Sequence, residues 1–299
     1  VFVHRVQGGL DMGRLEAAYA SLIEGHEVLR TTWHEGDDGL CMRVHDALHF
    51  ELQAQRVDPE EIDELRADFV ARLHRESFDL EQGPMLRAGV LSAGPDEALL
   101  VTVMHQLVVD DASFERLFGA LGEAYAERVE GQDLAQPLPV RVEEIEEPHD
   151  EGRACAYWGA LLHDRRLRTP LPTLPEGHGA LSRSLRRPLG EVLQGQLQAY
   201  ADKMESSLFE VIAALWVGFL RRWTGQEEIA FAYPVDLRPQ GAQSALGFAE
   251  NLLPMVVDAA GLSLSELVHH VRDARREASA HRHLPWERIL RAHREAGSL

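Results

Sequence analysis

The segment 98–104, Ala-Leu-Leu-Val-Thr-Val-Met, constrains the fold most, because it is apolar on both faces of the strand that it predicts. A turn at Gly94-Pro95-Asp96 precedes this segment, and a polar run from His105 to Asp111 follows it directly. A strand of this kind is typical of the centre of a sheet that is covered on both sides. We therefore expect a buried central strand that ends at a group of polar side chains.

Helical and strand patterns alternate irregularly along the rest of the chain. Asp11 precedes apolar residues at helical spacing, and a turn at 36–39 separates two apolar runs as in a hairpin. The region 208–224 follows a capping serine, Ser206 or Ser207, and is apolar nearly all round, which predicts a buried helix. Because regular β-α-β alternation is missing, we predict an α+β fold. The predicted strands are 1–6, 85–91, 98–104, 229–234 and 252–257, and the other predicted helices are 60–76, 113–130, 154–162, 189–204 and 263–280.

The composition excludes several classes of partner. The 299 residues include 30 basic and 49 acidic side chains and carry a formal net charge of −19, so the surface repels nucleic acid. No apolar run approaches the roughly 20 residues of a membrane span, and no secretory leader is evident. Cys41 and Cys155 lie far apart without metal-like spacing and are typical of reduced thiols. We expect a cytoplasmic protein with no membrane contact.

Seven short segments along the chain carry a family resemblance. They are His26–Trp33, Phe78–Arg87, His105–Asp111, Tyr157-Trp158, Tyr233–Pro239, Gly247–Pro254 and His281–Glu287. In this order they resemble the condensation domains of nonribosomal peptide synthetases. One segment alone would be weak support, whereas seven in sequence run through nearly the whole chain.

The resemblance implies an architecture. Condensation domains share a two-lobed, V-shaped fold similar to chloramphenicol acetyltransferase, and the closing part of the second lobe would be absent from this chain. An acidic stretch at 142–152, interrupted by Pro148, is expected to be a solvated connector between the lobes. We therefore predict an N-terminal lobe at 1–152 and an incomplete C-terminal lobe at 153–299.

The family's motif, His-His-x-x-x-Asp-Gly, is altered at two positions. His105 matches the first histidine and Asp110 the aspartate, but Gln106 replaces the second histidine and Asp111 replaces the glycine. The resemblance implies that the second histidine faces a tunnel where two carrier-bound substrates meet, and that Arg238 holds Asp110 from the other lobe. Glutamine can donate and accept hydrogen bonds but cannot take a proton from the attacking amine. Loss of a general base typically costs ~10²–10⁴ in rate.

We therefore expect no catalytic residue at His105, Gln106, Asp110 and Asp111, and a structural pair between the lobes at Asp110 and Arg238. His105 is expected to be a buried, hydrogen-bonded structural residue, and Arg30 a scaffold residue. The adjacent His269 and His270 would point apart on a helix, so no metal site is expected there, and no cofactor is expected.

The altered motif is similar to that of the X-domains of glycopeptide-antibiotic synthetases. That resemblance implies a non-catalytic domain that recruits cytochrome P-450 cross-linking oxygenases to a peptide on a peptidyl carrier protein domain, among flanking synthetase domains. The alternative is an active condensation domain that forms an amide or ester bond, with Gln106 orienting the nucleophile and proximity supplying the acceleration. An epimerisation-type relative and a free-standing acyltransferase that uses coenzyme A fit the motifs less well.

Overall fold

The computed structural model describes residues 1–36, 39–130, 150–165, 169, 187–238 and 245–296. It forms two compact units, of which the first comprises Val1–Glu147 with Asp236–Glu250, and the second Pro148–Val235 with Asn251–Leu299. The predicted division at residue 152 differs from these units in one main respect, because it assigned the segment 236–250 to the C-terminal lobe. The predicted connector lies mostly outside the described residues, and its last two residues begin a helix.

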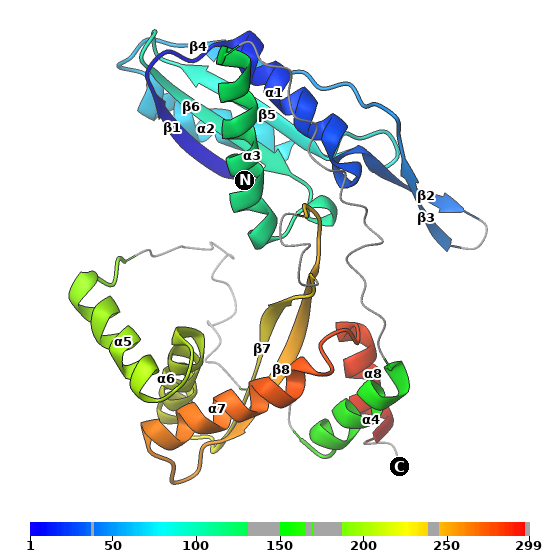
Figure 1. The fold of residues 1–299 in the computed structure, drawn as a ribbon, viewed down its shortest axis with the longest axis vertical. Coiled ribbons are helices and arrows are strands. Elements are labelled where there is room, and N and C mark those ends of the chain that lie inside the picture. Colours follow the sequence, from blue (N-terminus) through cyan, green and yellow to red (C-terminus); the bar gives the residue numbers. More distant parts are fainter. Residues whose placement is uncertain (37–38, 131–149, 166–168, 170–186, 239–244, 297–299) are drawn as a thin grey trace, which may run out of the picture. The chain divides into compact units, whose positions relative to one another are not determined.

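The first unit contains a four-stranded sheet in the order β1-β6-β5-β4 (Figure 1). The outer strand β1 and the strand β5 each pair antiparallel with β6, whereas β4 runs parallel to β5. The bounds of the strands are β1 Phe2–Gln7, β4 Gln53–Arg56, β5 Leu86–Ser92 and β6 Glu97–Met104. The expectation that 98–104 forms a central, buried strand is confirmed, because only the two end residues of β6 are partly exposed.

Helices cover both faces of this sheet, and the side chains of β6 point alternately toward the two faces. Ala98 and Leu100 pack in one cluster with residues of α1 (Met12–Gly25) and α3 (Asp111–Glu130). Leu99, Val101 and Val103 pack in a second cluster with Phe69 and Leu73 of α2 (Ile62–Arg75). Because successive side chains of a strand point to opposite faces, an uninterrupted apolar run serves both clusters.

Gly89 of β5 lies where the sheet approaches α2 closely. A Cβ atom there would lie 2.8 Å from Leu73 Cδ1 and 2.9 Å from Phe69 Cζ, so the short distance between sheet and helix requires glycine. A hairpin of β2 (Thr31–Gly36) and β3 (Gly39–Val44) follows a short helix at Glu27–Arg30, as the turn at 36–39 predicts. Residues 37 and 38 of that turn lie outside the described residues.

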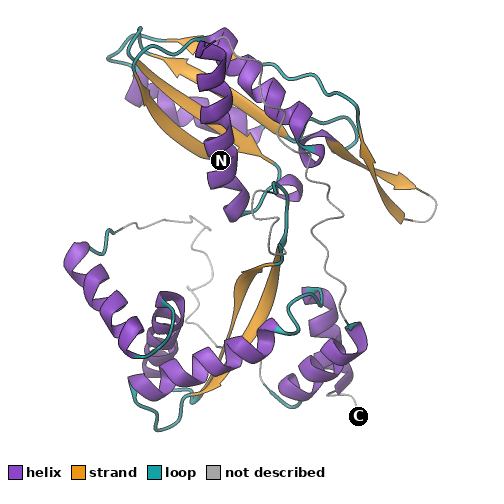
Figure 2. Ribbon diagram, viewed as in Figure 1, coloured by secondary structure: helices purple, strands orange, loops and turns teal. Residues whose placement is uncertain are grey.

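The second unit combines helices with a two-stranded sheet of β7 (Glu228–Asp236) and β8 (Glu250–Asp258) (Figure 2). Its core is a single cluster centred on fully buried side chains such as Trp158, Val217, Ile229 and Leu253. Trp158 Nε1 donates a hydrogen bond of 3.1 Å to the His281 carbonyl oxygen, which joins two of the family-like segments. The helices are α4 Glu151–Leu162, α5 Glu191–Lys203, α6 Leu208–Thr224, α7 Leu264–Ser279 and α8 Trp286–Ala296.

Helix α6 begins where the sequence predicts but is not buried all round. Ser207 caps it in a capping box with Glu210, and Gly225 ends it in the left-handed conformation. Helix α6 contacts α5 and α7, but the prediction of a fully buried helix is wrong, because several of its apolar side chains are exposed. Four of them, Ile212, Trp216, Phe219 and Trp223, are each 44–54% exposed, and we call them the α6 stripe.

We expect the α6 stripe to make the 299-residue chain self-associate, since exposed apolar patches of this kind promote association. Replacing both Trp216 and Phe219 with lysine should shift the sedimentation profile of a concentrated sample toward monomer. Replacing Gln194 and Gln196, two exposed polar residues of α5, with lysine is the matched control, because it adds the same charge without removing apolar surface, and it should leave the profile unchanged. A parent chain that stays monomeric at every concentration would refute this expectation.

No helix among the described residues is long and apolar enough to cross a membrane. Both cysteines are free thiols.

Candidate functional site

The altered motif begins where the central strand β6 ends. His105 follows Met104, and its backbone N–H donates a hydrogen bond of 2.9 Å to the Met85 carbonyl oxygen beside it. A single turn of 3₁₀-helix at Gln106–Val108 then carries the chain toward α3, whose first residue is Asp111. The sequence places the motif at this point because Val108 and Val109 are buried and anchor the turn to the unit.

The His105 ring is bound to its own turn. Its Nδ1 atom accepts a hydrogen bond of 3.2 Å from the Leu107 backbone N–H. The Phe78 ring lies edge-on to it at a centroid distance of 5.8 Å, and the Arg87 guanidinium lies 4.0 Å from the centroid of that Phe78 ring. His105 is therefore held in place by groups from two family-like segments, and it is half-buried rather than fully buried.

Gln106 and Asp111 lie at the surface of the motif. Both residues are exposed, and within the described part of the chain neither side chain makes a hydrogen bond or an ion pair. The two positions that depart from the family pattern are thus both exposed to another molecule, as is Leu107 between them. Gln106 can only donate and accept hydrogen bonds, whereas Asp111 brings a carboxylate to the first turn of α3.

Asp110 is the centre of a buried polar network. Its Oδ2 atom lies 2.9 Å from Arg238 Nη1 and accepts a hydrogen bond of 2.9 Å from the Ala249 backbone N–H. Its Oδ1 atom accepts hydrogen bonds from Arg238 Nη2 at 3.0 Å and from the Ser113 hydroxyl and backbone N–H at 2.7 and 2.8 Å. The side chains of Asp110 and Arg238 are 0% and 1% exposed, so this charge pair is removed from water.

The other N–H groups of Arg238 bind residues of its own segment, 236–250. Its Nε donates to the Ala245 carbonyl oxygen at 3.0 Å and Nη2 to the Gly247 carbonyl oxygen at 2.7 Å. Its Nη1 also contacts Asp236 Oδ1 at 3.0 Å. A buried pair is favourable only when its hydrogen-bonding capacity is satisfied in this way.

The structure brings Asp110 and Arg238 together, but inside one unit. The sequence suggested a pair between lobes, because Arg238 belongs to the second half of the chain. The segment 236–250 is part of the first unit, so both partners lie there. The pair therefore holds this returning segment onto the first unit, and Leu246 joins the apolar cluster of α1 and α3.

The charge state of Asp110 follows from these contacts. Burial alone would raise the pKa of its carboxyl group. The hydrogen bonds from Arg238, the Ala249 N–H and Ser113 outweigh burial and hold the pKa of Asp110 below its usual value. Asp110 is ionised near neutral pH and is fully engaged, so it has no lone pair free for a substrate.

Glu250 is a residue of this site that the sequence analysis missed. It follows Ala249, whose N–H binds Asp110, and burial raises the pKa of its carboxyl group. The neighbouring carboxylates of Asp110, Asp111 and Asp236 raise it further. Glu250 stands within the family-like segment Gly247–Pro254, but the residues around it in sequence give no signal that it lies near Asp110.

Replacing Glu250 with glutamine should stabilise the protein at pH 7. A folded-state pKa above the ordinary value of 4.5 means that the ionised form is disfavoured in the folded protein. The gain should be at most about 1 kcal/mol, because the group is partly exposed and screened. It should vanish as the pH falls below 4.5, where the carboxyl group is protonated in both states.

Urea denaturation at pH 7 and at pH 4 measures this effect, with Glu24→Gln as a control at an exposed position. Equal stabilisation by both variants, or a gain that persists at pH 4, would contradict it.

The other candidate residues from the sequence do not belong to this site. Arg30 donates hydrogen bonds to the backbone carbonyls of Glu24 and His45, which fits a scaffold residue. His270 Nδ1 lies 2.9 Å from the Glu266 carbonyl oxygen of its own helix. Within the part of the chain that the structure describes, no three His, Cys, Asp or Glu side chains are arranged to hold a metal ion.

Known proteins resemble this chain along nearly its whole length. A family model described as "Condensation domain" matches residues 2–298. A linear gramicidin synthase of Brevibacillus parabrevis is 30% identical over 312 residues, which cover 96% of this chain and 4% of that protein. A plipastatin synthase of Bacillus subtilis (strain 168) is 27% identical over 303 residues, which cover 96% of this chain and 11% of that protein.

Solved structures agree on the fold. The first condensation domain of the calcium-dependent antibiotic synthetase has a TM-score of 0.83 at 21% identity, with 99% of this chain and 72% of that chain covered. The X-domain from teicoplanin biosynthesis has a TM-score of 0.76 at 22% identity, with 98% and 68% covered. The same kind of domain in a complex with OxyB has a TM-score of 0.71 at 22% identity, with 98% and 67% covered. The predicted α+β condensation-domain fold is confirmed, and the chain spans about 70% of these solved domains and a small part of each synthetase.

Proposed function

The chain belongs to the condensation-domain family of nonribosomal peptide synthetases, and from this premise we propose that it is a non-catalytic member that recruits oxygenases. Its partners are cytochrome P-450 enzymes that cross-link a peptide held on a peptidyl carrier protein domain, as in glycopeptide-antibiotic biosynthesis. The observation that carries the proposal is Gln106, an exposed amide at the position where the family has its second histidine.

The chemistry of the site supports the absence of a general base. Aminolysis of a thioester is accelerated by a group that orients the amine or accepts its proton. Gln106 can orient an amine but cannot accept a proton at any accessible pH.

His105 does not replace the missing base. Because its Nδ1 accepts the Leu107 N–H, the neutral ring carries its proton on Nε2. Neither nitrogen of that tautomer has a free lone pair to offer an amine. Asp110 is occupied as well, since Arg238, Ser113 and Ala249 engage both of its oxygens.

The likeness to X-domains supports the recruitment role. Structures of the X-domain from teicoplanin biosynthesis, alone and in a complex with OxyB, share this fold over nearly the whole of the chain. The curated relatives are synthetases in which a match covers only a small share of the protein, so flanking synthetase domains and carrier proteins are part of the proposal.

Glu250 favours a second candidate function, an active condensation domain. Its carboxyl group has a raised pKa beside the altered motif, which is a property of general bases. If Glu250 accepted the proton of the amine while Gln106 oriented it, the domain would form an amide or ester bond. Glu250→Gln would then abolish product formation.

Two measurements made side by side test the proposal. The first is the binding of OxyB of teicoplanin biosynthesis to the chain, measured by calorimetry. The second is the transfer of an acyl group between two loaded carrier proteins. We expect OxyB to bind and no transfer above the uncatalysed rate. Transfer at the rate of a two-histidine condensation domain, without OxyB binding, would overturn the proposal.

A further inference from the structure

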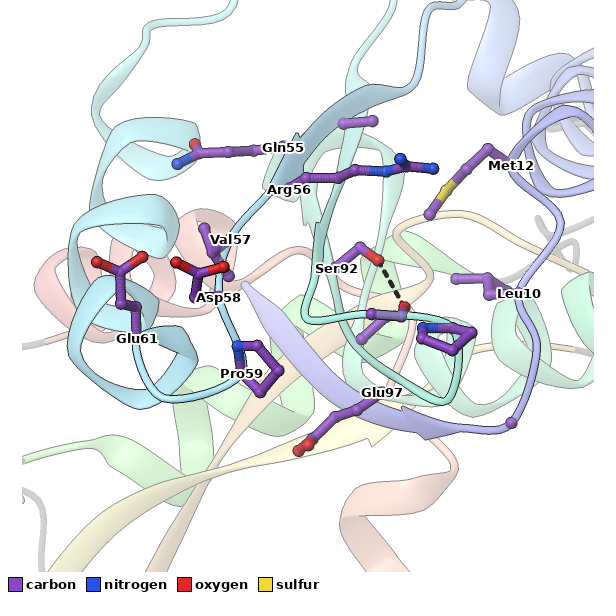
Figure 3. Close-up of a pocket in the computed structure, with 15 residues that line it drawn as sticks. Leu10, Met12, Gln55, Arg56, Val57, Asp58, Pro59, Glu61, Ser92 and Glu97 are labelled. Atoms are coloured by element: carbon purple, nitrogen blue, oxygen red, sulfur yellow. Dashed lines mark hydrogen bonds between the residues drawn. The ribbon is translucent and has the colours of Figure 1, made fainter.

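A groove lies at one end of the four-stranded sheet of the first unit. It has a volume of about 950 Å³ and opens between the segment before α1 and the segment before α2 (Figure 3). The last residues of β4 and β5 and the first of β6 also line it. The family motif follows the opposite end of β6, so this groove lies apart from His105 and Gln106.

The walls of the groove are partly apolar. Leu10 and Met12 line it on the α1 side, and Val57 and Pro59 line it on the α2 side (Figure 3). A ligand with both apolar and charged parts could place its apolar part against these side chains. Such a mixture is typical of the contact surfaces of proteins.

The carboxylates in and beside the groove fall into two groups, those that pair with a cation and those that do not. Arg5 pairs with Glu97 at 2.6 Å and with Asp63 at 2.8 Å, so these two carboxylates already have a cation. Asp58 and Glu61 line the groove on the α2 side, where the Glu61 backbone N–H donates a hydrogen bond of 2.9 Å to the Asp58 carbonyl oxygen (Figure 3). Both residues are exposed, and neither side chain has a partner within the described ranges. Two anionic groups are therefore available beside an apolar wall.

The surroundings reinforce this negative charge. The sequence Asp58-Pro-Glu-Glu-Ile-Asp-Glu64 contains five carboxylates and no basic residue. Of the described residues that line the groove, Arg56 is the basic one, and its guanidinium lies on the side near Met12 (Figure 3). A cation that enters the groove thus meets a net negative lining, and the net charge of −19 steers it there.

We propose that this groove is the docking site for a basic, arginine- or lysine-bearing segment of the recruited oxygenase. The proposal rests on the function proposed above and names the surface through which that function acts. The cation of the partner pairs with Asp58 and Glu61, and the apolar part of the same segment packs on Leu10, Met12 and Val57. Arginine suits such a site because its guanidinium pairs with carboxylates while its stem covers apolar surface.

The test uses charge-reversed chains and two probes, OxyB and a hexa-arginine peptide. Asp58→Lys with Glu61→Lys reverses the free carboxylates, and we expect each probe to bind at least ten-fold more weakly. Glu24→Lys with Glu123→Lys makes the same change in net charge at exposed positions of α1 and α3, and binding should weaken less than three-fold. Arg56→Gln removes the opposing cation, so it should strengthen hexa-arginine binding at least two-fold.

Each failure identifies which proposal is wrong. If OxyB binds the parent chain and both double variants equally well, the groove is not the docking site, although recruitment stands. If OxyB does not bind the parent while hexa-arginine binds in the groove, the recruitment proposal fails and the chemistry of the groove is right. Equal loss of hexa-arginine binding in the two double variants would show only general charge attraction and overturn the inference. Circular dichroism of each variant confirms its fold.

Discussion

Replacing Arg238 with methionine should lower the stability of the first unit by about 3–5 kcal/mol, the cost of leaving a buried charge without its partner. Asp110 would keep hydrogen bonds from Ser113 and Ala249 but lose the one cation that pairs with it among the described residues, although its side chain is fully buried. Hydrogen exchange of the Ala249 amide, which binds Asp110, reports the loss directly.

Two further variants control this prediction. Arg116→Met breaks a longer contact of 3.7 Å to Asp236 at a partly exposed position and should cost about 1 kcal/mol or less. Arg238→Met with Asp110→Leu removes both charges and should recover part of the loss, since an apolar replacement of a buried pair is often tolerated. An Arg238→Met chain as stable as the Arg116→Met chain would show that the pair does not hold the returning segment.

Restoring the family motif should raise the rate of acyl transfer. Gln106→His with Asp111→Gly returns an imidazole and removes a carboxylate from the first turn of α3. A positioned general base contributes ~10²–10⁴ in rate, so the double variant should exceed the parent by at least the lower figure. Gln106→Asn with Asp111→Gly is the matched control, because it changes the same two positions without adding a titratable group.

An equal rate in the restored and control chains would show that the missing imidazole is not what limits transfer.

Local sequence patterns predicted most helices and strands of this fold, because the residues that specify each of them lie close together in sequence. The uninterrupted apolar run of β6, the capping serine of α6 and the turn of the β2–β3 hairpin each lie within a few residues. Strand β4 was missed, since Gln-Ala-Gln-Arg has no apolar alternation and forms a strand only through parallel pairing with β5.

The remaining differences arise from long-range placement. The sequence of α6 shows how apolar the helix is, but its burial depends on which neighbours cover it, and one face is exposed. The return of residues 236–250 to the first unit follows from contacts more than one hundred residues apart in sequence, such as Arg238 to Asp110. Glu250 was missed for the same reason, because only the fold brings it to Asp110, Asp111 and Asp236.

The single-turnover rate of acyl transfer by the parent chain and by its Gln106→Ala variant tests the central claim most directly. If the amide at this position takes no part in proton transfer, removing it should change the rate by less than about two-fold, which is small beside the effect of losing a general base. A parent that forms product readily, and a variant slower by about 10² or more, would contradict the claim that this motif no longer catalyses condensation.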